Sequence, residues 1–281
     1  MRIVWLNGEW LPENEAKVSI FDRGLTFAQS VYEVAPVIGG RIANWPHHAA
    51  RLGNSLKTAL IADHTEWPGV LAELIRRNRM DEGRVYLQVT AGSSGDRDFA
   101  LPDPPIRPTR IAYTQTASLL ADPRAEKGLR IVLRPDLRWH LRSAKTTQLL
   151  YAVLMKEAAR LAGVDDAWLV EGGKITEATS QNAHIIDARG ILVSHPVDSG
   201  VLPGVTRISV IEIAREQGLT IEERPFTPDE LFAAREAFVS AAGTLVLPVV
   251  EVDGRAIGDG KPGSAARAIR AAYIDRLRGG R

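Results

Sequence analysis

A lysine near the middle of the chain is the first candidate for chemistry. Lys145 lies in the run Arg-Ser-Ala-Lys-Thr-Thr-Gln that begins at Arg142, between an expected strand and an expected helix. Only seven lysines are present, at positions 17, 57, 127, 145, 156, 174 and 261, so few residues can carry lysine chemistry. A buried lysine has a lowered pKa and becomes a nucleophile that can form a Schiff base. The alternative is a surface lysine at a helix start, where the helix dipole disfavours a cation.

Three further features suit a phosphorylated cofactor with a pyridine ring. Glu177, after an expected strand and a Gly-Gly turn, can pair with a pyridine nitrogen and help the ring withdraw electrons; otherwise it is a solvated turn residue. The run Gly204-Val205-Thr206-Arg207 precedes an expected helix, and a helix N-terminus with a hydroxyl binds phosphate, although threonine is also a common helix cap. Arg51, on an expected helix, can hold a phosphate through two N–H groups, or is merely an arginine on a helix.

Several other chemistries are excluded by residues that the chain lacks. There is no cysteine, which removes disulfides, thiolate zinc sites, iron–sulfur clusters and cysteine nucleophiles. No GxxxxGK[ST] phosphate loop, no GxGxxG after a strand, no HExxH and no GxSxG occurs. His47 and His48 lie at the start of an expected helix without a carboxylate cluster, so no metal site is expected.

The composition is that of an ordinary soluble globular protein. It has 281 residues, 45% hydrophobic and 25% charged, with a net charge of +1, so neither nucleic acid nor a membrane is expected as a partner. The N-terminus lacks a long apolar signal region, and no stretch approaches 18 uninterrupted apolar residues. We therefore expect a cytoplasmic protein.

The elements that would position these residues are a mixture of hairpins and helices. Helices are expected near residues 46–61, 68–79, 148–162, 206–217 and 228–233 and at the C-terminus. Strands are expected near 3–6, 31–38, 84–90, 111–114, 129–134, 167–170, 184–186, 191–194, 219–223 and 237–240, and a hairpin over 249–257. Residues 91–109, rich in glycine and proline, form a long loop of a kind that is often functional. This pattern predicts an α+β fold with a small N-terminal domain over 1–117, a linker over 118–123 and a large C-terminal domain over 124–281.

Landmarks along almost the whole chain resemble the class IV aminotransferases of pyridoxal 5'-phosphate (PLP) fold type IV, most of all the D-amino-acid aminotransferases. The landmarks are Asp22-Arg23-Gly24, Val31-Tyr32-Glu33-Val34, His48-Ala-Ala-Arg51-Leu52, Arg84 to Thr90, Arg138-Trp139, Lys145, Glu177-Ala-Thr-Ser-Gln-Asn182, Leu202 to Arg207 and Pro248 to Gly254. Each string is weak alone, but their order and separations are specific.

The resemblance implies roles by position. Lys145 matches the lysine that bonds PLP and shuttles the proton between Cα and C4', and Glu177 matches the partner of the pyridine nitrogen. The other implied cofactor contacts are Arg51, Val205 and Thr206 at the phosphate, with Thr244 as a further hydroxyl, Arg138 close to the cofactor, and Ser180 and Gln181 beside the ring. Tyr32 matches a tyrosine near the substrate.

The loop after the strand at residues 84–90 departs from the D-amino-acid enzymes. Those enzymes carry an Arg-x-His pair that grips the substrate carboxylate, whereas this loop reads Gly95-Asp-Arg97-Asp-Phe99, with Phe99 in place of the histidine. The carboxylate is then held by Arg97 alone, by another arginine such as Arg142, or less tightly. The departure bears on which substrate is used more than on the type of reaction.

The resemblance implies a homodimeric transaminase that moves an amino group from a D-amino acid to a 2-oxo acid, 2-oxoglutarate or pyruvate, by a ping-pong mechanism. Within the family, the alternatives are an (R)-amine or branched-chain aminotransferase and a lyase of the aminodeoxychorismate type. A binding protein that has lost catalysis is a further alternative, but it would need neither Lys145 nor Glu177.

Overall fold

The computed structural model describes residues 1–197 and 200–279. The chain divides into two compact units: unit 1 is residues 1–118 with 144–148, and unit 2 is residues 119–143 with 149–281. The segment 144–148, which contains Lys145, thus packs with the N-terminal residues although it lies far along the sequence. The predicted linker at 118–123 stays a prediction.

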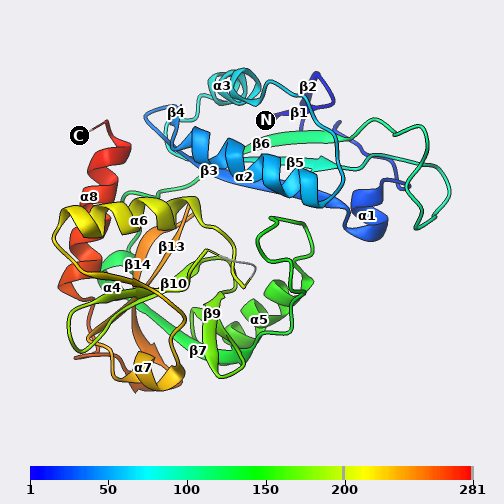
Figure 1. The fold of residues 1–281 in the computed structure, drawn as a ribbon. Helices are drawn as coiled ribbons and strands as arrows, with labels where there is room; N and C mark the ends of the chain where they lie inside the picture. The colour runs from blue at the N-terminus through cyan, green and yellow to red at the C-terminus, as the bar shows by residue number, and fades with distance from the viewer. Residues whose placement is uncertain (198–199, 280–281) are drawn as a thin grey trace. The chain divides into compact units, whose positions relative to one another are not determined.

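Unit 1 is an antiparallel sheet with two longer helices (Figure 1). The elements are β1 (Ile3–Leu6), β2 (Glu9–Pro12), α1 (Arg23–Phe27), β3 (Ser30–Ile38), β4 (Arg41–Ile42), α2 (Trp45–Thr58), α3 (Trp67–Arg77), β5 (Gly83–Thr90) and β6 (Arg110–Thr116), with the six strands in the order β2-β1-β6-β5-β3-β4. Because side chains alternate along a strand, Val85, Leu87 and Val89 pack in a core with Leu52 of α2 and Leu71 of α3.

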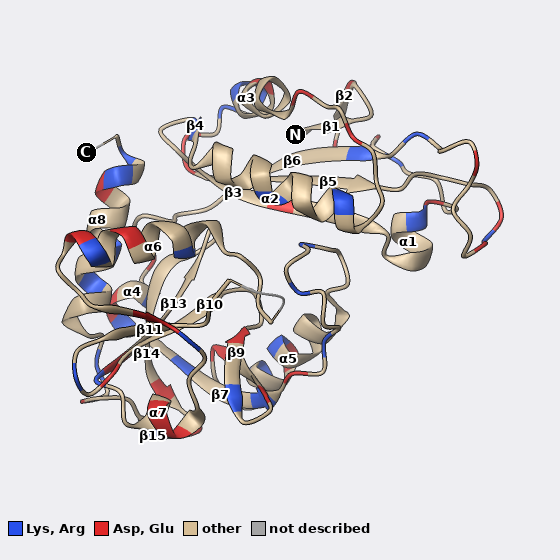
Figure 2. Cartoon of the chain, viewed as in Figure 1, with Lys and Arg blue, Asp and Glu red and all other residues tan. Residues whose placement is uncertain are grey.

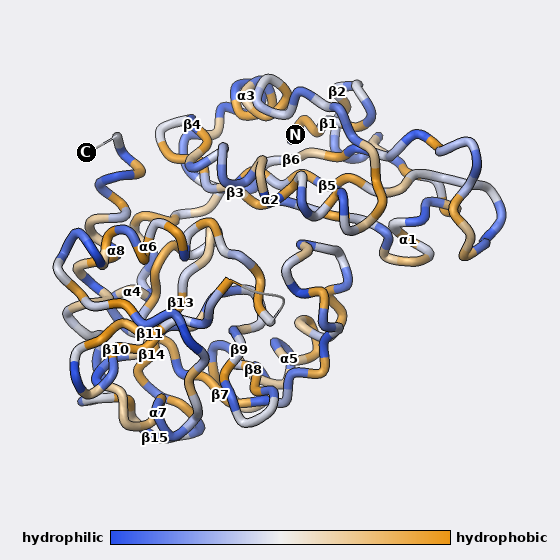
Figure 3. Tube along the Cα trace, in the orientation of Figure 1, coloured by the Kyte–Doolittle hydropathy of each residue, from blue (hydrophilic) through white to orange (hydrophobic). Residues whose placement is uncertain are grey.

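Unit 2 is built on a mixed sheet. Its elements are α4 (Arg124–Lys127), β7 (Leu129–Pro135), α5 (Leu150–Leu161), β8 (Asp166–Glu171), β9 (Lys174–Ala178), β10 (Asn182–Ile186), β11 (Leu192–Ser194), α6 (Val205–Glu216), β12 (Ile221–Glu223), α7 (Pro228–Phe232), β13 (Glu236–Ala241), β14 (Leu245–Val252), β15 (Arg255–Ala256) and α8 (Ser264–Leu277). The strand order is β12-β11-β10-β13-β14-β7-β8-β9, with β15 paired to β14. The large core cluster includes Trp168, Phe226 and Val239. Hydrophobic residues run along the strands (Figure 3), and acidic and basic residues are interspersed over each unit (Figure 2).

Most expected helices and strands are confirmed, with differences at short elements. The sequence analysis did not predict α1, α4 or β9. The two helices span only about one turn each, which is too short to show a helical period. β14 begins at Leu245 rather than at the expected Val249, and α5 begins at Leu150 rather than near Gln148. Pro36 lies in β3 outside the pairing with β4, which involves only Val37 and Ile38, so its missing N–H removes no ladder bond on that side.

Candidate active site

Lys145 lies on the outer edge of β3 in unit 1. Its carbonyl oxygen accepts a hydrogen bond from the Tyr32 backbone N–H at 3.0 Å, and its own N–H donates to the Ser55 hydroxyl of α2 at 2.9 Å. Its Nζ lies 4.1 Å from the centre of the Tyr32 ring. Lys145 precedes α5 by five residues, so its placement at a helix start, considered above, is wrong. The strand edge fixes the backbone while the amine rests against an aromatic face.

Tyr32 belongs to a row of three tyrosines on the face of the sheet opposite the core. Its ring stacks on Tyr86 of β5 with centroids 5.6 Å apart, and Tyr86 stacks on Tyr113 of β6 at 4.7 Å. Burial raises the pKa of Tyr86, so this hydroxyl stays protonated, and it donates to Gln88 Oε1. Stacking across three strands leaves the Tyr32 ring little freedom to turn away from Lys145.

Arg51 is held by a buried carboxylate. Glu33 of β3 accepts Arg51 Nε at Oε1 and Nη2 at Oε2, both at 2.8 Å, and its Oε2 lies 2.7 Å from His48 Nδ1. Burial alone would raise the pKa of Glu33, but the Arg51 guanidinium and the His48 hydrogen bond outweigh it and lower the pKa to about 2. Burial lowers the pKa of His48, which favours the neutral ring. The guanidinium of Arg51 is therefore oriented by contacts within unit 1.

Glu177 is a buried acid of unit 2, near the end of the edge strand β9. Its Oε1 accepts Arg138 Nη1 at 2.7 Å, and its Oε2 accepts the Asn182 side-chain amide and the Leu202 N–H, both at 3.2 Å. Burial raises the pKa of Glu177, and the adjacent Arg138 opposes this effect. A buried carboxyl of this kind is well suited to face a cation, because attraction is strong where water is scarce. Glu177 is thus no solvated turn residue, the alternative that the sequence left open.

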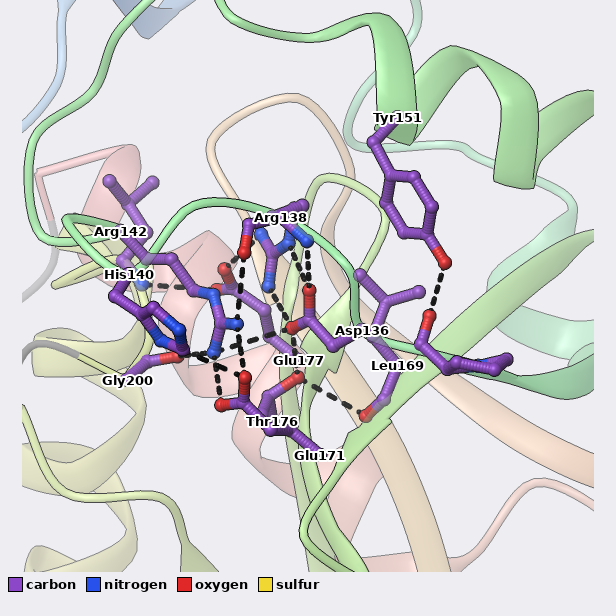
Figure 4. Close-up of polar contacts among 12 residues, drawn as sticks. Asp136, Arg138, His140, Arg142, Tyr151, Leu169, Glu171, Thr176, Glu177 and Gly200 are labelled. Atoms are coloured by element: carbon purple, nitrogen blue, oxygen red, sulfur yellow. Dashed lines mark hydrogen bonds and ion pairs between the residues drawn. The ribbon is translucent and has the colours of Figure 1, made fainter.

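Two arginines flank Glu177, and both are paired with acids (Figure 4). Arg138 lies between Asp136 and Glu177, with Nη2 at 2.7 Å from Asp136 Oδ2. Arg142 donates through both Nη atoms to Glu171 at 2.9 Å and through Nη1 to the Gly200 carbonyl. Burial would raise the pKa of Asp136, but the Arg138 guanidinium outweighs it and holds the pKa below its usual range. Both guanidiniums are consequently fixed within unit 2.

The N-terminus of α6 offers unsatisfied donors. The helix begins at Val205, and no side chain caps its first turn. The Thr206 hydroxyl is buried and has no hydrogen-bond partner among the described residues. A Cβ on Gly204 would lie 1.8 Å from Asn182 Oδ1, so only glycine permits this close approach. Free backbone N–H groups with an unpartnered hydroxyl at the start of a 12-residue helix fit an oxyanion such as phosphate.

The remaining predicted residues of unit 2, Gln181, Thr244 and Ser180, differ in burial and in hydrogen bonding. Gln181 is buried; its amide donates to the Thr244 hydroxyl at 2.8 Å, and its Oε1 has no partner among the described residues. Ser180, in the turn after β9, is exposed. The roles of these residues toward a cofactor stay predictions.

Arg97 lies on the exposed loop of unit 1 between two aromatic rings. Its guanidinium carbon is 4.7 Å from the centre of Phe27 and 4.9 Å from the centre of Phe99. Phe99, which replaces the expected histidine, thus contacts Arg97 directly. The predicted grip of Arg97 on a carboxylate stays a prediction.

Three residues that shape these groups had no role assigned from the sequence. Glu33 orients Arg51, Asp136 orients Arg138, and Asn182 joins Glu177 to the Leu202 carbonyl. Glu33 and Asn182 both lie inside the landmark strings, which was the available signal. For Asp136, the only signal in the sequence was its position two residues before Arg138.

Unit 1 thus carries a lysine amine against a tyrosine, and unit 2 carries a buried carboxyl and a helix start with free donors. Groups of these kinds suit amino-group chemistry with a phosphorylated cofactor. The sequence model for class IV aminotransferases matches residues 30–252. The chain therefore belongs to the class IV aminotransferase family, and the resemblance inferred from its landmarks is confirmed.

Relatives and solved structures agree with this assignment. A D-alanine aminotransferase of Staphylococcus aureus (strain N315) is 33% identical over 276 residues, covering 97% of each chain, and one of Bacillus licheniformis is 32% identical over 272 residues, covering 96% of this chain and 95% of the relative. A solved T.th. branched-chain amino acid aminotransferase with pyridoxamine 5'-phosphate matches with a TM-score of 0.89 and 25% identity, over all of this chain and 95% of that one. The Escherichia coli branched-chain enzyme, at 22% identity, matches with a TM-score of 0.90 over 99% of this chain and 95% of that one. The predicted α+β fold of type IV is confirmed.

Two kinds of feature are absent from the described residues. No helix there is long and apolar enough to cross a membrane. No group of three or more histidine, cysteine, aspartate or glutamate residues there is arranged to hold a metal ion.

Proposed function

We propose that the chain is a PLP-dependent aminotransferase that moves an amino group from a D-amino acid to a 2-oxo acid, 2-oxoglutarate or pyruvate, by a ping-pong mechanism. The observation that carries the choice of a D-amino acid is the 32–33% identity to D-alanine aminotransferases over nearly the full length of both chains. In the net reaction, the donor leaves as its 2-oxo acid and the acceptor leaves as an amino acid. A homodimer and a cytoplasmic location stay predictions.

The described residues fit this cofactor. Within unit 2, the unpartnered Thr206 hydroxyl and the N–H groups at the start of α6 suit its phosphate. The contribution of Arg51, a residue of unit 1, to phosphate binding stays a prediction. The buried Glu177 suits its ring nitrogen, because an anion there favours the protonated ring. When bound, PLP supplies an aldehyde carbon for the amino group and a ring that takes up the electron pair left at Cα.

The protein's own groups bind and move protons. Lys145 is the residue that would hold the cofactor covalently, and its Nζ would take the proton from the substrate Cα and return it. Tyr32 limits where that amine can lie. Arg138 fixes the carboxylate of Glu177 and is itself held by Asp136. Glu177 would therefore keep its orientation when its carboxylate pairs with the ring nitrogen.

Phe99 favours a second candidate, transamination of (R)-amines. An aromatic ring in place of a histidine removes one hydrogen-bond donor from the expected carboxylate grip and adds an apolar surface. An amine without a carboxylate loses nothing at such a site, whereas an amino acid loses one charge-assisted contact.

A substrate panel decides between these functions. D- and L-alanine, D- and L-glutamate, L-leucine and the two 1-phenylethylamine enantiomers are each assayed with pyruvate and 2-oxoglutarate, omitting pairs that regenerate their own acceptor. The proposal expects the D-amino acids to have the highest kcat/KM. Preference for L-leucine or for the (R)-amine would replace the proposal with the corresponding alternative, and Lys145→Ala serves as the inactive control.

A further inference from the structure

The loop of residues 91–109 is closed at its base by one carboxylate. Asp22, which precedes α1, accepts the hydroxyl of Thr90 at 3.0 Å and that of Thr109 at 2.6 Å through the same oxygen. Thr90 ends β5, and Thr109 immediately precedes β6, so a single buried side chain ties together the two ends of the loop. Figure 1 shows the loop running from these two strands past α1.

The next residue holds the tip of the loop. Arg23 donates Nη1 to the carbonyl oxygens of Asp98 at 2.7 Å and Ala100 at 3.3 Å, and Nη2 to that of Phe99 at 3.3 Å. Its Nε is fixed by Gln29 Oε1 at 2.7 Å, and its backbone N–H binds the Gly92 carbonyl. Arg23 is only 4% exposed, so these bonds form away from solvent, where such contacts hold a backbone best.

The segment fixed in this way presents Arg97 beside two rings. Phe27, at the end of α1, receives the Arg97 guanidinium at 4.7 Å and that of Arg23 at 4.6 Å, while Phe99 covers Arg97 from the loop itself at 4.9 Å. In the described part of the chain, no hydrogen bond or ion pair joins Arg97 to Asp96 or Asp98. Stacking uses the flat faces of a guanidinium and leaves its N–H edges available.

We propose that Arg23 is a positioning residue for substrate recognition: it fixes the loop tip so that Arg97, stacked on Phe27 and Phe99, receives the carboxylate of the amino acid or 2-oxo acid. The inference rests on the proposed function for its substrate. In this proposal Phe99 contributes to carboxylate binding indirectly: it orients Arg97, whereas the histidine of the D-amino-acid enzymes binds the carboxylate itself.

The test combines loop order with substrate selectivity in the full-length holoenzyme. The variants are Arg23→Lys, which keeps the charge but cannot reach three carbonyls, and Phe27→Leu, which spares those hydrogen bonds. Arg97→Leu removes the grip itself. Arg130→Lys is the matched control, since Arg130 also binds a carbonyl, that of Gly163, but belongs to unit 2, whereas the loop and the tyrosine row belong to unit 1.

Two quantities are measured for each variant. The first is the mobility of a nitroxide label on a single cysteine, Leu101→Cys, which is specific because the chain has no cysteine and Leu101 is exposed. The second is the ratio of kcat/KM for D-alanine to that for ethylamine, measured without the label. Arg23→Lys should make the label severalfold more mobile and lower the ratio at least tenfold, with kcat/KM for ethylamine unchanged. Phe27→Leu should lower the ratio severalfold. Adding Arg23→Lys to Arg97→Leu should lower it no further, and Arg130→Lys should match wild type.

Unchanged label mobility in Arg23→Lys, or higher mobility with an unchanged ratio, overturns the positioning role. Failure of the proposed function is a separate result, namely wild-type enzyme that turns over no D-amino acid. In that case 2-oxoglutarate is the probe: lower mobility of the label on its addition, lost in Arg23→Lys, supports the positioning role, and absence of that effect overturns it.

Discussion

Replacing Glu33 by glutamine should destabilise unit 1 in a way that depends on pH. The carboxylate accepts both Arg51 nitrogens at 2.8 Å and lies 2.7 Å from His48 Nδ1, and all three side chains are buried. The pKa of Glu33 falls from 4.5 to about 2, which corresponds to about 3 kcal/mol at neutral pH. Loss of one partner of a buried ion pair typically costs about 3–5 kcal/mol, in agreement.

The sign of the pH dependence follows from the lowered pKa. Because the folded state holds Glu33 ionised to a lower pH than the unfolded state does, its contribution is complete well above pH 4.5 and is lost as the pH falls toward about 2. The difference between wild type and Glu33→Gln should therefore shrink from about 3 kcal/mol at pH 7 to about 1 kcal/mol at pH 3.

The measurement is native-state hydrogen exchange of the β3 and α2 peptides in the full chain, because the two units need not unfold together. Glu13→Gln is the control: Glu13 also pairs with an arginine, Arg2, at 2.6 Å in unit 1, but both are exposed, so little change is expected. A Glu33→Gln protein as stable as wild type, or a loss of equal size at both pH values, would refute the reasoning.

Three further variants test the cofactor residues. Lys145→Ala should lose the visible absorbance that borohydride bleaches and all turnover; normal turnover would move the covalent bond to another lysine. Glu177→Gln should retain PLP but slow the chemical step in single-turnover experiments, and an unchanged rate would count against an ion pair with the ring nitrogen. Thr206→Val should weaken PLP binding about tenfold, for one lost hydrogen bond to a charged group, without lowering apoprotein stability, since that hydroxyl has no partner among the described residues; a destabilised apoprotein would contradict this.

The sequence was most informative where local pattern and chemistry coincide. The helix expected near residues 46–61 is confirmed as α2, and the run from Gly204 to Arg207 precedes a helix as expected. The scarcity of lysine directed attention to Lys145. Local sequence patterns did not predict the position of residues that pack against segments distant in the sequence. Lys145 lies on the edge of β3 because residues 144–148 pack with unit 1, and nothing within the expected strand-to-helix connection indicates that.

The ion pairs could not be predicted from the sequence, because their members are distant from one another along the chain. Glu33 and Arg51 are 18 residues apart, and Arg138 and Glu177 are 39 apart, so neither helical nor strand spacing brings them together. Glu177 was expected near a turn, but β9 begins at Lys174, directly after that turn, and buries it. Only the tertiary fold distinguishes a buried acid with three donors from a solvated glutamate.

The pairing of these arginines also decides where a substrate carboxylate is expected. Arg51 is paired with Glu33, Arg138 with Asp136 and Glu177, and Arg142 with Glu171. A substrate that took Arg51 or Arg138 from its acid would leave a buried carboxylate unpaired, at a cost of about 3–5 kcal/mol. Arg142 is itself buried and already donates to Glu171 and to the Gly200 carbonyl. Arg97 has no acidic partner among the described residues and rests on two rings, so a carboxylate can bind it without breaking an existing ion pair. Among these four arginines, replacement of Arg97 should therefore reduce the selectivity for amino acids over amines most.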